Sequence, residues 1–132
     1  MALNRQEVDE LLNKEEIAYI GTTRPDGRPH VMPIWFIYHE GKIYFETDIT
    51  TAKFKNIQHN NKVMVVFGGK NTYIVEGSVK WCKENELSFP IRKMYWDKYG
   101  KDMDDSYITE KTLLFELIPE KEQSWHYAPS WY

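Results

Sequence analysis

The stretch of sequence best suited to chemistry is an expected helix start that is rich in hydroxyl and ammonium groups. Thr50 and Thr51 precede the segment AKFKNIQHN, in which Lys53 and Lys55 follow at short spacing. We expect one of the threonines to cap a short helix, because its oxygen can accept a hydrogen bond from a free N–H of the first turn. Free N–H groups, the helix dipole and nearby lysines together favour an anion such as phosphate. The same pattern is common on solvated helices, so its meaning depends on its neighbours.

The strand expected upstream of this helix carries two prolines. The run Arg28–Tyr38 (RPHVMPIWFIY) has apolar side chains on both faces, so a helix, a ligand or a second subunit must cover the face that the interior does not. Pro29 and Pro33 cannot donate to a strand ladder. Either this strand lies at a sheet edge with a solvated backbone, or its interrupted pairing leaves N–H and C=O groups for the edge of a bound heterocycle.

The sequence does not have the residue spacing of a metal site or the motif of an acyl-transfer site. Cys82 is the single cysteine, and no G-x-S-x-G motif is present. The histidines lack the spacing of metal ligands, and we expect no metal site. They are His30, His39, His59 and His126.

The carboxylates give no clear catalyst. Asp102, Asp104 and Asp105 lack the glycine-centred loop of a calcium site, which favours a solvated loop. Glu46 and Glu76 lie in expected strands and could face a pocket, although such residues more often point to solvent. We therefore leave the catalytic residues unassigned. The lack of an evident catalytic side chain fits a protein whose chemistry belongs to a bound cofactor.

The remaining elements follow from hydrophobic periodicity and turn residues. They predict a mainly β fold in which an antiparallel meander forms one wall of a small barrel. The tail QSWHYAPSWY is too apolar to be left free and should lie against the body or a partner chain. Gly21 and Gly77 are candidate bulges. The expected strands are Ile17–Thr23, Arg28–Tyr38, Lys42–Thr47, Val63–Phe67, Thr72–Trp81 and Lys111–Pro119, and the expected helices are Arg5–Asn13, one or two turns after Thr51, and Pro90–Tyr99.

Length and composition predict a single globular domain over residues 1–132, with 42% hydrophobic and 28% charged residues. The net charge of −3 lacks the basic surplus of a nucleic-acid-binding surface. No apolar run approaches the roughly 20 residues of a membrane span, and the N-terminal residues do not resemble a signal peptide. We therefore expect a cytoplasmic protein that contacts neither nucleic acid nor membrane.

The order of these segments resembles a known family. The runs IAYIGTTRPDGRPHVMPIWF, GKIYFET, TAKFKNIQHNNKVMVVF and VEGSVKW are together similar to the pyridoxamine 5′-phosphate oxidase-like, FMN-binding split-barrel family, over about residues 15–118. The resemblance implies a split barrel of about six antiparallel strands with small helices. It also implies a homodimer with flavin sites at the subunit interface.

The resemblance further implies roles for particular residues. The segment Met32, Pro33, Ile34 and Trp35 matches the one that lines the isoalloxazine ring in the family. Thr47 matches a position beside the ribityl chain or phosphate. Thr51, Lys53 and Lys55 match the phosphate-holding segment, whereas Asn56 matches a structural position. Trp125 or His126 of the second subunit is a candidate to close the site.

Two departures from the family pattern limit what is carried over. Ala52 and Lys55 stand where relatives often have arginine, which reduces bidentate clamping of the phosphate. The chain also lacks the arginine-bearing C-terminal segment of true pyridoxamine phosphate oxidases, so we do not expect vitamin B6 synthesis.

Three functions follow from the resemblance. The first is an FMN-dependent oxidoreductase that moves hydride or electrons between a reduced nicotinamide and a small-molecule substrate. The second is a non-catalytic carrier or sensor of flavin, deazaflavin or haem. The third is a dimeric barrel that binds no cofactor and acts through protein contacts.

Overall fold

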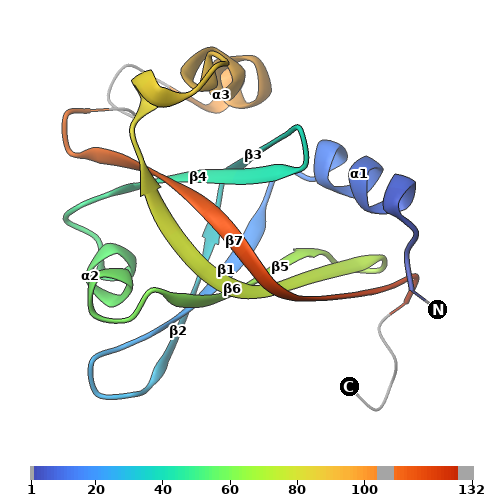
Figure 1. Cartoon of the computed structure of the whole chain (residues 1–132), viewed down its shortest axis with the longest axis horizontal. Helices are drawn as coiled ribbons and strands as arrows, with labels where there is room; N and C mark the ends of the chain where they lie inside the picture. The colour runs from blue at the N-terminus through green and yellow to red at the C-terminus, as the bar shows by residue number, and fades with distance from the viewer. Residues whose placement is uncertain (1, 104–108, 128–132) are drawn as a thin grey trace.

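The computed structural model describes residues 2–103 and 109–127. In this part of the chain, seven antiparallel strands form one curled sheet in the order β2-β1-β5-β6-β7-β4-β3 (Figure 1). The predicted mainly β split-barrel class is therefore confirmed. The strands are β1 (Ala18–Thr23), β2 (Pro29–Ile34), β3 (Phe36–His39), β4 (Lys42–Asp48), β5 (Lys62–Gly68), β6 (Thr72–Cys82) and β7 (Thr112–Trp125). The helices are α1 (Arg5–Lys14), α2 (Ala52–His59) and α3 (Ile91–Tyr99), with short 3-10 turns η1 (Glu84–Glu86) and η2 (Gly100–Asp102).

The two edges of the sheet are joined by a single residue. β2 ends at Ile34 and β3 begins at Phe36, so Trp35 alone separates the two edge strands. The sheet must curl for its edges to come this close, which produces the split barrel. The expectation of one continuous strand over Arg28–Tyr38 is wrong, because the segment divides at Trp35 and gives seven strands where six were expected. β2 does lie at an edge, as one of the two interpretations of its prolines required.

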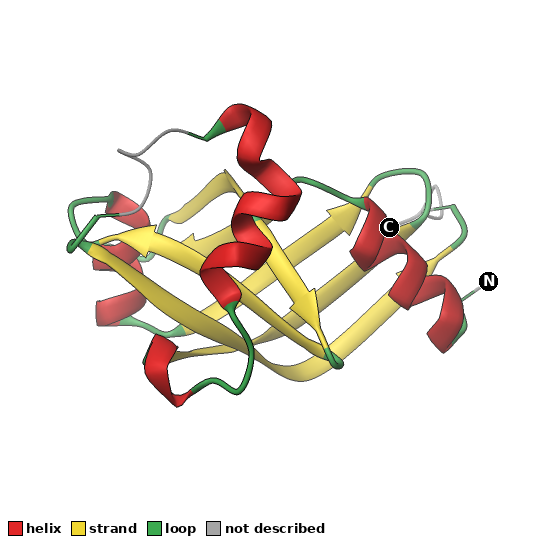
Figure 2. Ribbon diagram, turned by 90° about the horizontal axis from the view of Figure 1, so that it is seen from above, coloured by secondary structure: helices red, strands yellow, loops and turns green. Residues whose placement is uncertain are grey.

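Helix α3 supplies hydrogen-bond and stacking partners for the residues at the break between β2 and β3. It lies over the curled sheet when the molecule is seen from above (Figure 2). The ring of Tyr99 stacks on Trp35 with centroids 4.4 Å apart. The Phe36 N–H donates to the Tyr99 hydroxyl at 3.0 Å, and that hydroxyl lies 2.7 Å from the carbonyl oxygen of Glu16. Ile91, Tyr95 and Tyr99 form the buried side of this helix.

Two apolar cores hold these layers together. The larger fills the barrel and includes Ile20, Phe36, Phe45, Phe67 and Val75, all fully buried. The smaller lies between α3 and the outer face of the strands that it covers. Its buried members are Ile37, Tyr44, Ile91, Tyr95, Tyr99 and Leu114.

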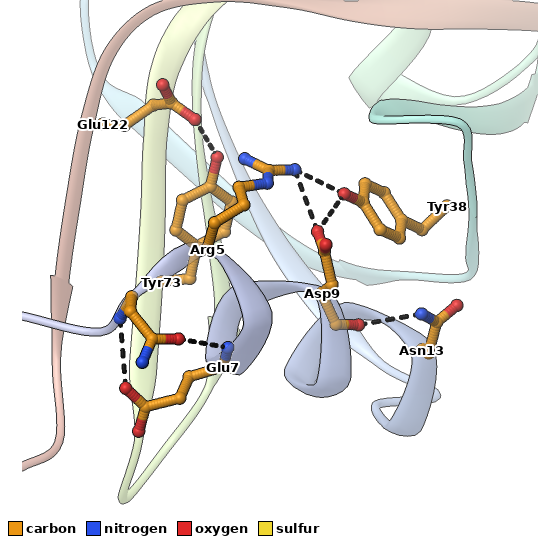
Figure 3. Close-up of polar contacts among 8 residues, drawn as sticks. Arg5, Glu7, Asp9, Asn13, Tyr38, Tyr73 and Glu122 are labelled. Atoms are coloured by element: carbon orange, nitrogen blue, oxygen red, sulfur yellow. Dashed lines mark hydrogen bonds and ion pairs between the residues drawn. The ribbon is translucent and has the colours of Figure 1, made fainter.

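Helix α1 is fixed at its start and along one side. Asn4 and Glu7 form a capping box, in which each side chain accepts a hydrogen bond from the other's backbone N–H. Arg5 and Asp9, one turn apart, both bond the hydroxyl of Tyr38 on β3 (Figure 3). These contacts tie α1 to an edge of the barrel.

The two expected bulges have different outcomes. β6 and β7 change register between Glu76 and Gly77, so a bulge is confirmed there. Gly21 pairs in unbroken register with Val31 on β2 and Met64 on β5, so the bulge expected at this glycine is wrong. A regular strand can hold a glycine that has no bulge to make, and here the opposing backbone leaves ordinary space for a side chain.

The last strand is longer than expected and includes the start of the aromatic tail. β7 pairs with β6 as far as Trp125, opposite Thr72, and Leu3 N–H donates to the Ser124 hydroxyl at 3.0 Å. This part of the tail therefore lies against the body, whereas residues 128–132, like Asp104 and Asp105, lie outside the described residues. No helix in the described residues is long and apolar enough to span a membrane.

Candidate functional site

The start of α2 has the cap expected from the sequence. The Thr51 hydroxyl accepts a hydrogen bond from Phe54 N–H at 3.2 Å and donates to the Asp48 carbonyl at 2.8 Å. The Thr47 hydroxyl at the end of β4 lies 3.2 Å from the Thr51 hydroxyl. The fold therefore places two hydroxyl groups together at the helix start, which is the end of a helix that favours an anion.

Pro33 and Lys53 line the same cavity. This cavity has a volume of about 270 Å³, and Ile17, Ile34 and Trp35 complete its apolar wall. Burial lowers the pKa of the Lys53 ammonium, and removal from water is the cause. An anionic partner would favour the charged form of a lysine in this position. The proline-bearing strand and the helix start, separate in sequence, thus form one hollow.

The other residues expected at the site lie around this hollow or away from it. Met32 is exposed and pairs with Ile20 on β1. Lys55 is exposed one position beyond Phe54 and does not line the cavity. Asn56 is buried, and its amide donates to the Thr22 hydroxyl at 3.1 Å, which agrees with a structural role.

The C-terminal residues expected to close the site of a partner lie elsewhere within their own chain. His126 Nε2 is 3.3 Å from the carboxylate of Glu7 on α1. Figure 1 shows the end of β7 beside α1, with α2 at the opposite side of the molecule. In a single chain, therefore, Trp125 and His126 belong to the α1 end of the barrel.

Glu46 lines the cavity, although sequence reasoning named it without selecting it as a site residue. It lies on β4, is only 9% exposed, and lines the cavity of Pro33 and Lys53. Burial raises the pKa of its carboxyl to about 7. The flanking residues Tyr44 and Phe45 were the available signal, because a strand with apolar residues on both faces is covered on both sides. Of the two orientations that the sequence left open for Glu46, the structure shows the one that faces a pocket.

The comparison of the chain with protein families decides its membership. A family model described as pyridoxamine 5′-phosphate oxidase matches residues 5–126. The chain belongs to this family. The resemblance stated from the sequence motifs is thereby confirmed. No curated protein sequence matches the chain.

Solved structures with this family fold are similar over most of the chain. A conserved hypothetical protein from Mycobacterium tuberculosis has a TM-score of 0.81 at 20% identity, over 95% of this chain and 86% of that one. An F420 reductase has a TM-score of 0.71 at 19% identity, over 86% of this chain and 94% of that one. An FAD-binding protein from Mesorhizobium loti has a TM-score of 0.71 at 16% identity, over 94% and 95%. At these identities the likeness is one of fold, and function depends on the site.

The described residues fit one wall of a site for a phosphorylated planar ring. Pro33 and Trp35 add apolar side chains to the hollow, and the partly buried Lys53 brings an ammonium group to it. The hydroxyls of Thr47 and Thr51 supply neutral hydrogen-bonding groups at the helix start. A family cofactor with a ring and a phosphate could place the ring against the first pair and the phosphate near the lysine.

Proposed function

We propose that this chain binds FMN and is an oxidoreductase that moves hydride or electrons between a reduced nicotinamide and a small acceptor. The observation that carries the proposal is the cavity shared by Pro33 and Lys53. Membership of the pyridoxamine 5′-phosphate oxidase family supports it, as does the likeness in fold to an F420 reductase and an FAD-binding protein. The flavin would supply the redox chemistry, and the protein would bind and orient it.

Each residue of the predicted site has a task in this proposal, whether it lines the cavity or lies beside it. The backbone and side chains of Met32, Pro33, Ile34 and Trp35 hold the ring, with Met32 at the exposed margin. Lys53 offsets the phosphate charge, and the Thr51 cap leaves the first N–H groups of α2 for its oxygens. Thr47 lies beside the ribityl chain. Lys55, which is exposed, contributes only at longer range.

We propose that a second copy of the chain completes the site. An apolar surface runs across β1, β2 and β5, which we call the β1–β2–β5 face; its residues are Tyr19, Val31, Pro33, Met64 and Val66. Tyr19 is 49% exposed and Val31 is 61% exposed. Pro33 belongs to this face and also lines the cavity, so a partner that covers the face would close the open side of the hollow.

Removal of the positive charge at residue 53 tests whether Lys53 holds the phosphate. Lys53→Ala should weaken FMN at least tenfold and riboflavin, which has no phosphate, far less. Lys55→Ala is the matched control, because it removes an ammonium from the same helix outside the cavity, and it should change FMN affinity little. Flavin fluorescence quenching gives both dissociation constants. Equal losses for FMN and riboflavin in Lys53→Ala would contradict the assignment.

An absorbance spectrum with and without added FMN tests the cofactor itself and separates flavin, deazaflavin and haem. Full occupancy at a hundredfold excess over the dissociation constant should add about 2.7 kcal/mol of stability. A colourless chain with no such gain would refute cofactor binding. A flavin-loaded chain that oxidises no nicotinamide and reduces no acceptor would instead be a carrier.

A further inference from the structure

Glu46 is unusual because one of its carboxylate oxygens is buried with nothing to bond. Within the described residues, only Glu46 Oε2 and His30 Nδ1 are buried side-chain polar atoms without a hydrogen-bond partner. An unpaired buried polar atom costs about 1–3 kcal/mol, and more when the group is charged. Such a cost in a residue that lines a cavity points to a ligand that supplies the missing donor.

Glu46 also lines a second and larger hollow. This hollow, which we call the Trp81 cavity, has a volume of about 540 Å³, and Trp81, Arg92 and Leu114 are among its walls. It lies where the ends of β4 and β6 meet the start of β7, η1 and α3. A volume of this size lies in the range of small-molecule sites, which typically run from about 300 to 1,000 Å³.

The aromatic wall of the Trp81 cavity is open to a ligand. Trp81 is 53% exposed. The Lys83 ammonium lies 5.9 Å from the centre of its ring, at the long end of the range for a cation–π contact. Leu113 and Leu114 add apolar surface. A flat ring could therefore lie against the indole while its polar edge reaches Glu46.

Among the described residues, no lysine or arginine forms an ion pair with Glu46, although the charge of Arg92 acts on its carboxyl. Arg92 on α3 is bonded to Glu84 of η1, with Nε 2.5 Å from Oε2. Lys53 of α2 lines only the smaller cavity, and Lys83 is exposed at the end of β6. Cys82 is also in the wall, but burial raises the pKa of its thiol to about 11, so it is a neutral neighbour at physiological pH.

We propose that the Trp81 cavity binds a planar nitrogen heterocycle with an amidinium-type pair of N–H groups, which donates to Glu46 and stacks on Trp81. A carboxylate accepts two parallel N–H bonds from such a group, and the opposite charge favours the ionised carboxylate. The ring face of tryptophan attracts a delocalised cation. The proposal stands without a flavin. If FMN occupies the smaller cavity, Glu46 lies between cofactor and ligand.

The probe for this site is 2-aminobenzimidazole, which carries the required N–H pair on two fused rings. Calorimetric titration into the chain without FMN at pH 7.5 should give one saturable site. Glu46→Gln should weaken the probe at least tenfold, which is about 1.4 kcal/mol. Trp81→Ala should weaken it as well. Benzofuran, which has a similar shape and no N–H, should not bind at the same concentrations.

Glu76→Gln is the matched control, since that carboxylate lies on β6 near Lys121 and does not line the cavity. It should leave the affinity unchanged. A second readout follows the Glu46 side-chain carbon by NMR during a pH titration. The bound cation should lower the pKa of Glu46 from its raised value. A probe that binds Glu46→Gln as well as the parent chain, or shows no binding at millimolar concentration, would overturn the proposal. Neither result bears on FMN, whose binding is measured with Lys53→Ala.

Discussion

At the scale of single residues, two groups of opposite charge type are displaced from their ordinary ionisation in the same hollow. Burial lowers the pKa of Lys53 and raises the pKa of Glu46 to about 7. Both changes favour the neutral forms, as removal from water must. Each group would regain its charge if a ligand supplied the opposite one. A phosphate near Lys53 would therefore favour its ammonium form, and a cation near Glu46 would favour its carboxylate form, although both residues line one cavity.

The raised pKa of Glu46 predicts a distinct pH dependence of stability. Between the ordinary value of 4.5 and about 7, the folded chain keeps a proton that the unfolded chain has lost. The free energy of unfolding therefore falls as pH rises through this window. Glu46→Gln should remove this loss, so its stability relative to the parent chain should improve by on the order of 2–3 kcal/mol from pH 4 to pH 8.

Urea denaturation at both pH values measures this effect. Glu76→Gln is again the control, because its carboxylate is paired with Lys121 near the surface and should change the pH dependence little. Parallel pH profiles for Glu46→Gln and the parent chain would show that the carboxyl is not held neutral by burial.

At the scale of elements, the division between β2 and β3 depends on one hydroxyl from α3. Tyr99 accepts the Phe36 N–H and lies within hydrogen-bond reach of the Glu16 carbonyl. Tyr99→Phe keeps the ring and its stacking on Trp35 but leaves a buried N–H unpaired. We expect a loss of about 1–3 kcal/mol in the free energy of unfolding.

Tyr19→Phe is the control for this hydroxyl deletion, since Tyr19 is half exposed on β1 and should change stability by less than about 0.5 kcal/mol. Urea denaturation of both variants gives the comparison. Equal stabilities for the two variants would mean that the strand break does not rely on the Tyr99 hydroxyl.

The bulge in β6 makes a second prediction at this scale. A Cβ at Gly77 would lie 2.0 Å from the Ile118 carbonyl oxygen, a backbone atom that can move only with the strand. Gly77→Ala should therefore destabilise the chain by at least 1–3 kcal/mol, the usual range for forced overpacking. Gly21→Ala is the control, because its nearest contact is an ordinary 3.5 Å to Met64 oxygen. Thermal unfolding of both variants checks the contrast, and a mild effect at Gly77 would contradict it.

Local signals in the sequence predicted most elements of this fold. The Thr51 cap depends on a few neighbouring residues and forms as expected, and the Asn4–Glu7 capping box at the start of α1 is equally local. The division at Trp35 was not predictable in this way, because Phe36 N–H takes its partner from a residue 63 positions away. The burial of Glu46 likewise depends on elements brought over β4 by the whole topology.

At the scale of the whole molecule, the proposed cofactor site lies at the margin of the β1–β2–β5 face. On the same strands, the side chains that point inward, such as Ile20 and Val65, are fully buried. Tyr19 and Val31, which point outward, are exposed. A sheet with one face in the core normally presents polar residues on the other. An outward apolar face therefore supports the proposed partner, and a second copy of the chain is the partner that the family resemblance implies.

A charge on this face tests both the dimer and the completeness of the site. Val31→Lys should convert a dimer into a monomer, because association would bury an unpaired ammonium. Ile49→Lys is the matched control, since Ile49 is an exposed apolar residue outside the β1–β2–β5 face. Light scattering coupled to size exclusion gives the masses. The monomer should keep its fold by circular dichroism and bind FMN at least tenfold more weakly, because the open side of the Pro33 and Lys53 cavity then faces water. A parent chain that is already monomeric, or a Val31→Lys dimer of unchanged mass, would show that another surface or no partner completes the site.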